Sequence, residues 1–342
     1  MARAQRATIQ DVAVLSGLSI CTVSRALRNL PNVSESARHK VAEAAAKLGY
    51  KASSAAARLA GGSTGSIAII APTATAWFFA QAVEAAEEVF ADSGYDTVLI
   101  SLRNKPSVQR RVFNDLSALV QRVDGILLLN VDLSPAEVAL VSTAGLAVAS
   151  VGMDAVPWDD VGINNENAAW QATSHLLDLG HWDLAILSGK ESTGHSVSTP
   201  TDRFRGFRRA LADHFLVVHP DHVVTADSSI EGGRRAMMEL ITHRNLPSAI
   251  FADCDETAFG ALMALREHGL SSPKDVSIVG IDDHPMSWFL GLSTIYQPVA
   301  DQGAFAANLL IDRLQNPDAA HEPTQHLLNT KLIERKTTRR KR

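Results

Sequence analysis

The sequence predicts an α/β protein in which an all-α helix-turn-helix head precedes a two-lobed core with parallel sheets. Residues 1–64 carry 9 basic and 3 acidic side chains, whereas residues 65–330 carry 16 and 33. From Ser66 onward, short apolar runs alternate with helical patterns. The 342 residues suffice for about two or three domains at roughly 150 residues each. A basic head on an acidic body suggests nucleic-acid binding at one end of the chain.

The head begins with two short helices joined by a tight turn. Thr8 and Asp11 form a capping-box pattern at the start of the first helix, and Gly17 ends it. Ser19 is placed to cap the second helix. The inner positions of that helix are Val23, Ala26 and Leu27. Two short helices across a glycine turn predict a helix-turn-helix.

A third helix is predicted after Ser34. Its apolar positions recur at helical spacing, at Val41, Ala44, Ala45 and Leu48. The second helix then keeps outward Arg25 and Arg28 beside Ser24, residue types that suit phosphates and base edges. The head is therefore interpreted as a DNA-binding unit, and a helical fragment of a larger core is the alternative.

The chain then passes through a hinge into alternating strands and helices. Residues 52–60 are alanine-rich, and the GGSTG at 61–65 is typical of a flexible linker. The predicted strands are 66–70, 97–101, 125–130, 183–189, 223–226, 248–253 and 277–282. The predicted helices are 78–91, 107–120, 134–144, 166–179, 202–214, 231–243 and 255–268. Two α/β lobes with a ligand cleft beyond the strand ends follow from this order.

The sequence shows no constellation of catalytic residues. It lacks a dinucleotide or phosphate-binding glycine motif, and it has no nucleophile elbow. His214, His219 and His222 flank a Pro-Asp turn and are interpreted as a solvated loop, not as metal ligands. The two cysteines and the polar N-terminus favour a cytoplasmic protein without a membrane segment. We expect no enzyme activity, no cofactor and no metal.

Several strings of residues closely resemble the LacI/GalR family of bacterial transcription regulators. They include Thr8-Ile9-x-Asp11-Val12-Ala13, Thr22-Val23-Ser24-Arg25-Ala26-Leu27, Asp255-Glu256-Thr257-Ala258-Phe259-Gly260-Ala261 and Val279-Gly280-Ile281-Asp282-Asp283. The resemblance implies a head at 1–51, a hinge helix and linker at 52–65, and a periplasmic-binding-protein-like core at 66–342. It further implies a homodimeric repressor on a near-palindromic operator, controlled by a small-molecule effector.

The resemblance assigns roles to residues of the head and the hinge. The implied base contacts are Ile20, Cys21, Arg25 and Arg28, and the implied phosphate contacts are Thr8, Ser19, Thr22, Ser24 and Ser34. Leu59, with Ala56 beside it, is expected to enter the minor groove at a central base step. Ala52-Ser53 replaces the family's Pro-Asn, so we expect hinge ordering to differ.

The resemblance also places the effector site between the lobes. The implied contacts are Trp77, Phe78, Arg203, Ser228, Asp255 and Asp282. Ser228 stands where many members have an aromatic platform, and Cys254 replaces the usual Asn. A sugar is the leading effector on family grounds, with a nucleoside or an organic acid as rivals and loss of ligand control as a further alternative. Rival classes are a sugar-binding protein without DNA activity and an α/β enzyme such as a sugar kinase.

Overall fold

The computed structural model describes residues 7–27, 33–48, 63–189, 196–242, 246–319 and 322–341. The chain divides into two compact units. The first is Met1–Gly65 with Gln121–Asp124, and the second is Ser66–Val120 with Gly125–Arg342. Among the described residues, no helix is both long and apolar enough to span a bilayer.

The head consists of three helices, as predicted. They are α1 (Ile9–Ser16), α2 (Ile20–Leu27) and α3 (Glu35–Leu48). Val12, Val23 and Val41, one from each helix, are at most 1% exposed and form the centre of a small core. Leu48, predicted as an inner position, is exposed because it is the last residue of α3.

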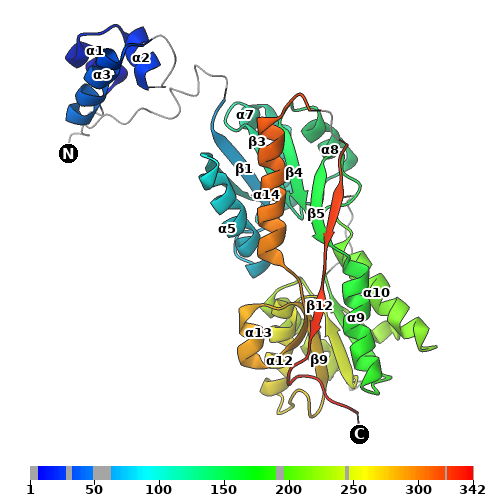
Figure 1. Ribbon diagram of the computed structural model, residues 1–342. Helices are drawn as coiled ribbons and strands as arrows, with labels where there is room; N and C mark the ends of the chain where they lie inside the picture. The colour runs from blue at the N-terminus through cyan, green and yellow to red at the C-terminus, as the bar shows by residue number, and fades with distance from the viewer. Residues whose placement is uncertain are drawn as a thin grey trace. The chain divides into compact units, whose positions relative to one another are not determined.

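The first lobe of the second unit contains a six-stranded, all-parallel sheet in the order β11-β5-β4-β3-β1-β2. Its strands are β1 (Ser66–Ala71), β2 (Asp96–Ser101), β3 (Gly125–Leu129), β4 (Ala147–Val151), β5 (Asp159–Ile163) and β11 (Gln325–Leu328). Its helices are α5 (Trp77–Asp92), α6 (Pro106–Asn114), α7 (Leu116–Val120), α8 (Pro135–Ser142) and α14 (Val299–Gln315). Helices α5 and α14 lie side by side against this sheet (Figure 1).

The second lobe contains a six-stranded sheet in the order β12-β10-β9-β8-β6-β7, in which only the β10–β12 pair is antiparallel. Its strands are β6 (Leu184–Ser188), β7 (Val223–Thr225), β8 (Ala249–Ala252), β9 (Ser277–Asp282), β10 (Ser293–Tyr296) and β12 (Lys331–Ile333). Its helices are α9 (Asn165–Asp178), α10 (Thr199–Asp213), α11 (Ile230–Thr242), α12 (Asp255–Glu267) and α13 (Pro285–Leu290), with a 3₁₀ turn at Pro220–His222.

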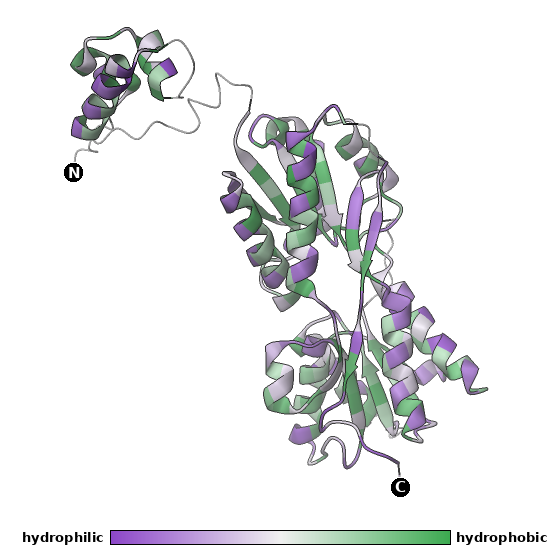
Figure 2. Ribbon diagram, in the orientation of Figure 1, coloured by the Kyte–Doolittle hydropathy of each residue, from purple (hydrophilic) through white to green (hydrophobic). Residues whose placement is uncertain are grey.

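Both faces of the second sheet are covered, which explains its continuous apolar strands. In β6, Ala185 and Leu187 pack with α11 and α12, whereas Leu184 and Ile186 pack with α9 and α10. Adjacent residues of a strand point to opposite faces, so every position must be apolar when helices cover both. Figure 2 shows this pattern as hydrophobic strands beneath helices with polar outer faces.

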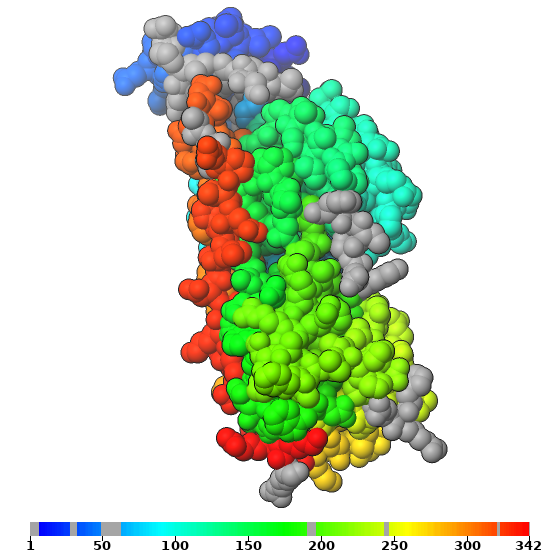
Figure 3. All heavy atoms as spheres, turned by 90° about the vertical axis from the view of Figure 1, so that its right-hand side faces the viewer, coloured from blue at the N-terminus to red at the C-terminus, as the bar shows by residue number. Residues whose placement is uncertain are grey.

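Within the described residues, the chain crosses between the lobes three times. The crossings follow β5, β10 and β11 and lead into α9, α14 and β12 (Figure 1). The last crossing carries the C-terminal residues onto the second lobe, where they lie against its surface (Figure 3). Thr337 is 3% exposed, and the backbone N–H of Lys341 donates to the Leu179 carbonyl at 2.9 Å. The backbone of the C-terminal residues is therefore held against the second lobe, whereas the side chains of Arg339, Arg340 and Lys341 are exposed.

Two further predictions need correction. The predicted helix at 107–120 is two helices, α6 and α7, which are separated at Asp115. His222 does not lie in a solvated loop, because it is 3% exposed and its Nδ1 lies 3.2 Å from the Asp183 carboxylate. Buried histidines need a polar partner, and Asp183 supplies one here.

Candidate functional site

Helix α2 leaves its outer face open. Ile20 is 48% exposed, Cys21 is exposed, and Arg25 in the last turn is partly exposed. The opposite face carries Val23 and Ala26, which are buried against α1 and α3. A helix that is packed on one side and open on the other has the dimensions to enter a DNA major groove.

Three of the five hydroxyl groups expected at phosphates, those of Thr8, Ser19 and Ser34, cap the N-termini of the three head helices. Thr8 Oγ1 accepts the backbone N–H of Asp11 at 3.4 Å, and the backbone N–H of Thr8 donates to the Asp11 carboxylate at 2.7 Å, which completes a capping box. Ser19 accepts the backbone N–H of Thr22 at 3.1 Å, and Ser34 caps α3 in the same way. Hydrogen bonds from the Thr8 backbone N–H and from the Thr8 hydroxyl lower the pKa of Asp11. Helix N-termini attract anions, so each is suitably placed for a phosphate.

The remaining residues of the expected DNA-binding set divide into two groups. Ser24 lies in α2 and is partly exposed. Arg28, Ala56 and Leu59 lie outside the described residues.

The core contains a cavity of about 180 Å³ between its two lobes. Its described lining includes Phe78, Phe79, Asn130, Asn165, Arg203, Ser228, Asp253, Cys254, Glu256, Asp282, Gln297 and Gln302. Four of the six residues expected at the effector are among them, namely Phe78, Arg203, Ser228 and Asp282. The cavity therefore combines an aromatic wall with one cation, three carboxylates and several amides.

Close packing of two helices positions Arg203. A Cβ on Gly206 would lie 2.1 Å from the Glu166 carbonyl oxygen, so α10 can approach α9 this closely only with glycine there. Arg203, three residues earlier on α10, is 8% exposed. Its Nε donates to Asn165 Oδ1 at 3.0 Å, and its Nη1 donates to the Asp253 carbonyl.

Asp282 faces the same cavity from the end of β9. It is 6% exposed and has a φ of 136°, a backbone conformation that side-chain-bearing residues rarely adopt. Its carboxylate accepts from Gln297 Nε2 at 2.5 Å, and Gln302 donates to Gln297 at 3.1 Å. Burial raises the pKa of Asp282 to about 7, although nearby Arg203 and the Gln297 bond favour its charged form.

Asp253 and Ser228 form a polar part of the wall. Ser228 Oγ donates to Asp253 Oδ2 at 3.0 Å, and the backbone N–H of Gly189 donates to the same oxygen at 2.6 Å. Asp253 Oδ1 accepts from Thr257 at 2.9 Å. Burial and nearby Asp253 raise the pKa of the Cys254 thiol, so Cys254 presents a neutral group to the cavity.

The expected effector contacts Asp255 and Trp77 do not line this cavity. Asp255 is fully buried behind the wall, where it accepts from Ser287 and Thr294, each at 2.6 Å, and from the backbone N–H of His284. Trp77 packs against His284 in a tilted arrangement, with ring centroids 4.8 Å apart and an interplanar angle of 52°. The structure therefore gives Asp255 a structural role in which Ser287, Thr294 and His284 already occupy its oxygens.

Sequence reasoning missed several lining residues. Asp253 ends the predicted strand at 248–253, and the rule for ligands beyond strand ends indicated that loop. Gln297 and Gln302 lie at the second crossing between the lobes, and no local pattern marks them. Asn130 also ends a predicted strand, so the same rule could have identified it.

A loop of the second lobe is bonded to the first lobe next to the cavity. Ser196 is 1% exposed, and its Oγ accepts the backbone N–H of Leu133 at 2.6 Å. Its carbonyl accepts the backbone N–H of Asp154 at 2.9 Å. The Asp154 carboxylate accepts from both the backbone and the hydroxyl of Ser198 and from Gln325 Nε2 at 3.3 Å.

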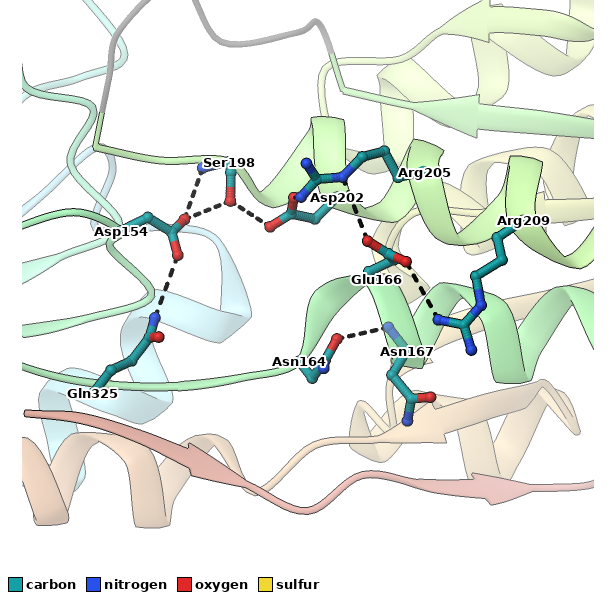
Figure 4. A network of polar contacts seen from close by, with 9 residues as sticks. All are labelled: Asp154, Asn164, Glu166, Asn167, Ser198, Asp202, Arg205, Arg209 and Gln325. Carbon is teal, nitrogen blue, oxygen red and sulfur yellow. Dashed lines mark hydrogen bonds and ion pairs between the residues drawn. The ribbon is translucent and has the colours of Figure 1, made fainter.

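Figure 4 shows that these contacts continue into α9 and α10. Ser198 also donates to Asp202, and Glu166 of α9 lies 3.5 Å from Arg205 and 3.3 Å from Arg209 of α10. The N-terminus of α10, four residues before Arg203, is thus fixed to the first lobe. Any change in lobe closure must alter these bonds together with the cavity.

Comparison with protein families gives two matches. Residues 8–53 match "Bacterial regulatory proteins, lacI family", and residues 173–338 match "Periplasmic binding protein-like domain". The HTH-type transcriptional repressor PurR of Actinobacillus pleuropneumoniae serotype 3 is 33% identical over 340 residues, covering 97% of this chain and 98% of the relative. PurR of Glaesserella parasuis serovar 5 is 35% identical over 316 residues and 90% of each chain.

Solved structures match over the same extent. The lac repressor dimer bound to operator and the anti-inducer ONPF has a TM-score of 0.83 at 27% identity, covering 98% of this chain and all of that chain. The complex of the transcriptional regulator CelR with cellobiose has a TM-score of 0.72 at 27% identity, covering 97% of this chain and all of that chain. Head and core together therefore share one architecture with these regulators.

Proposed function

Because the chain belongs to the LacI family of bacterial regulatory proteins, as a DNA-binding transcriptional repressor, we propose that a small molecule in the interlobe cavity controls its operator affinity. The observation that carries the proposal is the coexistence of an open recognition helix in the head and a cavity with Arg203 and Asp282 in the core. The domain boundaries of the proposal are a head at 1–51, a hinge at 52–65 and a core at 66–342.

The head binds DNA through α2 in the major groove. Ile20 and Cys21, in its first turn, reach base edges, and Arg25 bonds guanine through its planar fork, with Arg28 as a further contact. Backbone phosphates are held at Thr8, Ser19, Thr22, Ser24 and Ser34. Leu59 and Ala56 enter the minor groove at the centre of the operator. The support is the exposure of α2 and the position of the capping hydroxyls.

The protein works as a homodimer on a near-palindromic operator, since two identical heads read two half-sites. The support is an apolar face on α13, where Trp288 is 73% exposed and Phe289 is 77% exposed. Exposed aromatic side chains next to one another are typical of a protein interface.

A sugar is the proposed effector. Phe78 and Phe79 supply an apolar wall for a ring face, and Arg203, Asp253 and Asp282 supply partners for hydroxyl groups. Ser228 donates to Asp253 and makes the remaining wall polar. A flat base would be held better by a second aromatic side chain at this position. A purine base is the second candidate, because relatives of this chain are PurR repressors.

The effector acts by preferring one state of lobe closure. It must bind that state more tightly than the other, since equal affinity shifts no equilibrium. The test is fluorescence anisotropy of a labelled operator titrated with the full chain, with and without sugars and purines. The proposal predicts that at least one compound changes operator affinity about tenfold. Unchanged affinity with a compound shown by calorimetry to bind would contradict it.

A further inference from the structure

The C-terminal segment of the core has a charge opposite to that of the rest of the core. Residues 331–342 contain 7 basic and 1 acidic side chains, whereas residues 65–330 contain 16 and 33. Figure 2 shows the part that follows β12 as hydrophilic. A block of like charges repels itself and usually stays in solvent. The fixed course of this segment on the second lobe therefore requires specific contacts.

Buried threonine and serine side chains hold the backbone of the segment in place. The Oγ1 of Thr337 accepts the backbone N–H of Ser293 at 2.9 Å and donates to the Ile278 carbonyl at 2.7 Å. The backbone N–H of Arg339 donates to Ser277 Oγ at 3.3 Å. Ser277 and Ser293 are both fully buried, so these bonds anchor the segment in the second lobe.

A buried histidine and a helix end hold the next residues. His181 is 4% exposed, and its Nε2 donates to the Arg339 carbonyl at 3.0 Å, because a carbonyl oxygen can only accept. The backbone N–H of Lys341 donates to the Leu179 carbonyl, which ends α9. The backbone is thus fixed from Thr337 to Lys341, while the basic side chains of its last three residues extend outward.

These side chains form a cationic surface, here called the tail patch, with a lysine of the second lobe. Its members are Lys274, Arg339, Arg340 and Lys341, all of which are exposed. An Nη2 bond from Arg339 to the Lys274 carbonyl brings the two segments together. The nearby carboxylate of Asp275 accepts from the backbone and the hydroxyl of Ser271, at 2.8 and 3.0 Å. The patch therefore carries four cations beside one carboxylate.

The cations of the tail patch differ from other arginines of the second lobe in having no ionic partner. Among the described residues, no carboxylate forms an ion pair with any of the four. In contrast, Arg234 pairs with Glu267 at 3.0 Å, and Arg335 pairs with Asp283 at 2.6 Å. Unpaired cations on a fixed backbone are free to bind an external anion with little loss of chain entropy.

The chemistry around the tail patch favours a phosphate backbone as the partner. Among the described residues, the segments that carry the patch, 271–276 and 334–341, contain no exposed large apolar side chain. Protein interfaces have an apolar centre from which charged residues are depleted, and interfacial membrane binding buries an apolar face. Point charges without such a centre match DNA phosphates, which basic side chains contact without reading sequence.

The negative charge of the remaining core restricts how DNA can approach. Residues 65–330 would repel a duplex at long range, but at physiological ionic strength charges are screened beyond about 8 Å. Phosphates in direct contact with the tail patch therefore experience mainly its four cations. Binding at this surface must be weak at high salt and must strengthen steeply as salt is removed.

We propose that the tail patch is a second DNA-binding surface, which holds the phosphate backbone of a duplex independently of base sequence. Lys274, Arg339, Arg340 and Lys341 each contact a phosphate, and the head supplies sequence recognition separately. The surface requires no effector. The flanks of a bound operator and a second, separate duplex offer it the same chemistry.

The first experiment is a salt titration of the full chain, without effector, on a labelled duplex of mixed sequence. The test variant replaces Arg339, Arg340 and Lys341 by glutamine. Each lost phosphate contact lowers the slope of log affinity against log salt by about 0.9, so the variant should lose up to about 2.7. Its affinity at low salt should fall at least tenfold, about the effect of losing one to two contacts.

The matched control removes three positive charges elsewhere. Arg103, Arg110 and Arg111 are exposed on and before α6, and they form no ion pair among the described residues. Their replacement by glutamine gives the same net charge and should change the slope by less than one contact. An equal loss in both variants would show an effect of net charge alone and would overturn the proposal.

A charge-preserving variant tests whether positive charge is the cause. Arg339→Lys combined with Arg340→Lys should retain DNA affinity within about threefold, because lysine also binds phosphate as a point charge. Affinity as low as that of the glutamine variant would contradict the proposal. Thermal melting of each variant verifies that the second lobe is folded.

Lysine footprinting tests the wild-type protein directly. Saturating duplex should protect Lys274 and Lys341 from acetylation at least threefold, whereas exposed Lys105 should stay as reactive as in free protein. Mass spectrometry measures the modification at each site. Unchanged reactivity of Lys274 and Lys341 on DNA that saturates the protein would overturn the proposal, whatever the variants do.

Two arms identify the source of the phosphates. Capture of a second labelled duplex by protein already saturated with a first indicates a separate duplex, and tighter binding of a long duplex than of a short one indicates flanks. A gain in either arm that the glutamine variant loses supports the proposal, and no such gain in both arms overturns it. Binding to phosphatidylglycerol vesicles or polyglutamate that requires the patch, without any such requirement for DNA, would likewise overturn it.

Discussion

Replacing Arg203 by alanine should remove effector binding and leave DNA binding intact. Arg203 is 8% exposed and, among the lysines and arginines described, is the one that lines the effector cavity. Its guanidinium already donates to Asn165 and to the Asp253 carbonyl, and these bonds fix the orientation of the guanidinium plane toward a ligand. The variant loses a charged donor that no described neighbour in the cavity can replace.

The expected loss follows from the strength of hydrogen bonds to charged groups, about 1.5–3 kcal/mol each. One such bond to the ligand corresponds to a loss of affinity between about tenfold and 150-fold. A ligand at 100 times its dissociation constant stabilises the wild type by about 2.7 kcal/mol. After a 100-fold loss, the same concentration stabilises the variant by only about 0.4 kcal/mol.

The assay is a thermal-shift titration with a compound that stabilises the wild type, combined with anisotropy on operator DNA. Arg208→Ala is the matched control, since Arg208 lies five residues further along α10, is exposed, and lies over the ring of Phe204 outside the cavity lining. The control should keep the full ligand-induced shift. A normal shift in Arg203→Ala, or an equal loss in Arg208→Ala, would refute the assigned role.

Three other predictions test the architecture around both sites. Gly206→Ala should lower the melting temperature of the core by several degrees and weaken effector binding, because the added Cβ would overlap the Glu166 carbonyl oxygen. Calorimetry that shows wild-type stability would contradict the close approach of α10 to α9. Thr8→Ala should destabilise the head by about 1 kcal/mol through loss of the α1 cap, measured as an earlier head transition, while an unchanged transition would argue against the capping box. Burial raises the pKa of Asp160 to about 7, above its usual 3.8, so ionisation of Asp160 opposes folding, and the free energy of unfolding should fall as the pH rises from about 4 to about 7. Urea unfolding should show a loss of about 2 kcal/mol between pH 5.5 and 7.0 that Asp160→Asn lacks. An identical pH profile in the variant would be the contrary result.

The sequence was most informative where local chemistry decides the structure. The cap at Thr8 and the stop at Gly17 both form as predicted, because each depends on residues only a few positions apart. Strands with continuous apolar runs were equally clear. In contrast, β4 and β5 escaped prediction. Strand β5 contains two buried acidic residues: Asp159 accepts from Thr324, which is 165 residues away, and Asp160 accepts from Ser150 and from the backbone N–H of Met153.

The site was predictable in part for the same reason. Arg203 lies on one helix, α10, and the family resemblance identified it at the sequence level. Asp255 lies two residues after Asp253, yet only Asp253 faces the cavity. That choice depends on Ser287 and Thr294, which are more than 30 residues away and bind Asp255 behind the wall. Gln297 reaches the cavity only because the chain crosses between lobes there.

Selection of binding sites from random duplex DNA with the full chain tests the central claim most directly. The account predicts enrichment of a near-palindromic sequence whose affinity falls steeply with salt, because two heads contact phosphates and bases in two half-sites. Enrichment of no palindrome, or binding that is equally strong for all sequences, would contradict the account of this chain as a sequence-specific repressor.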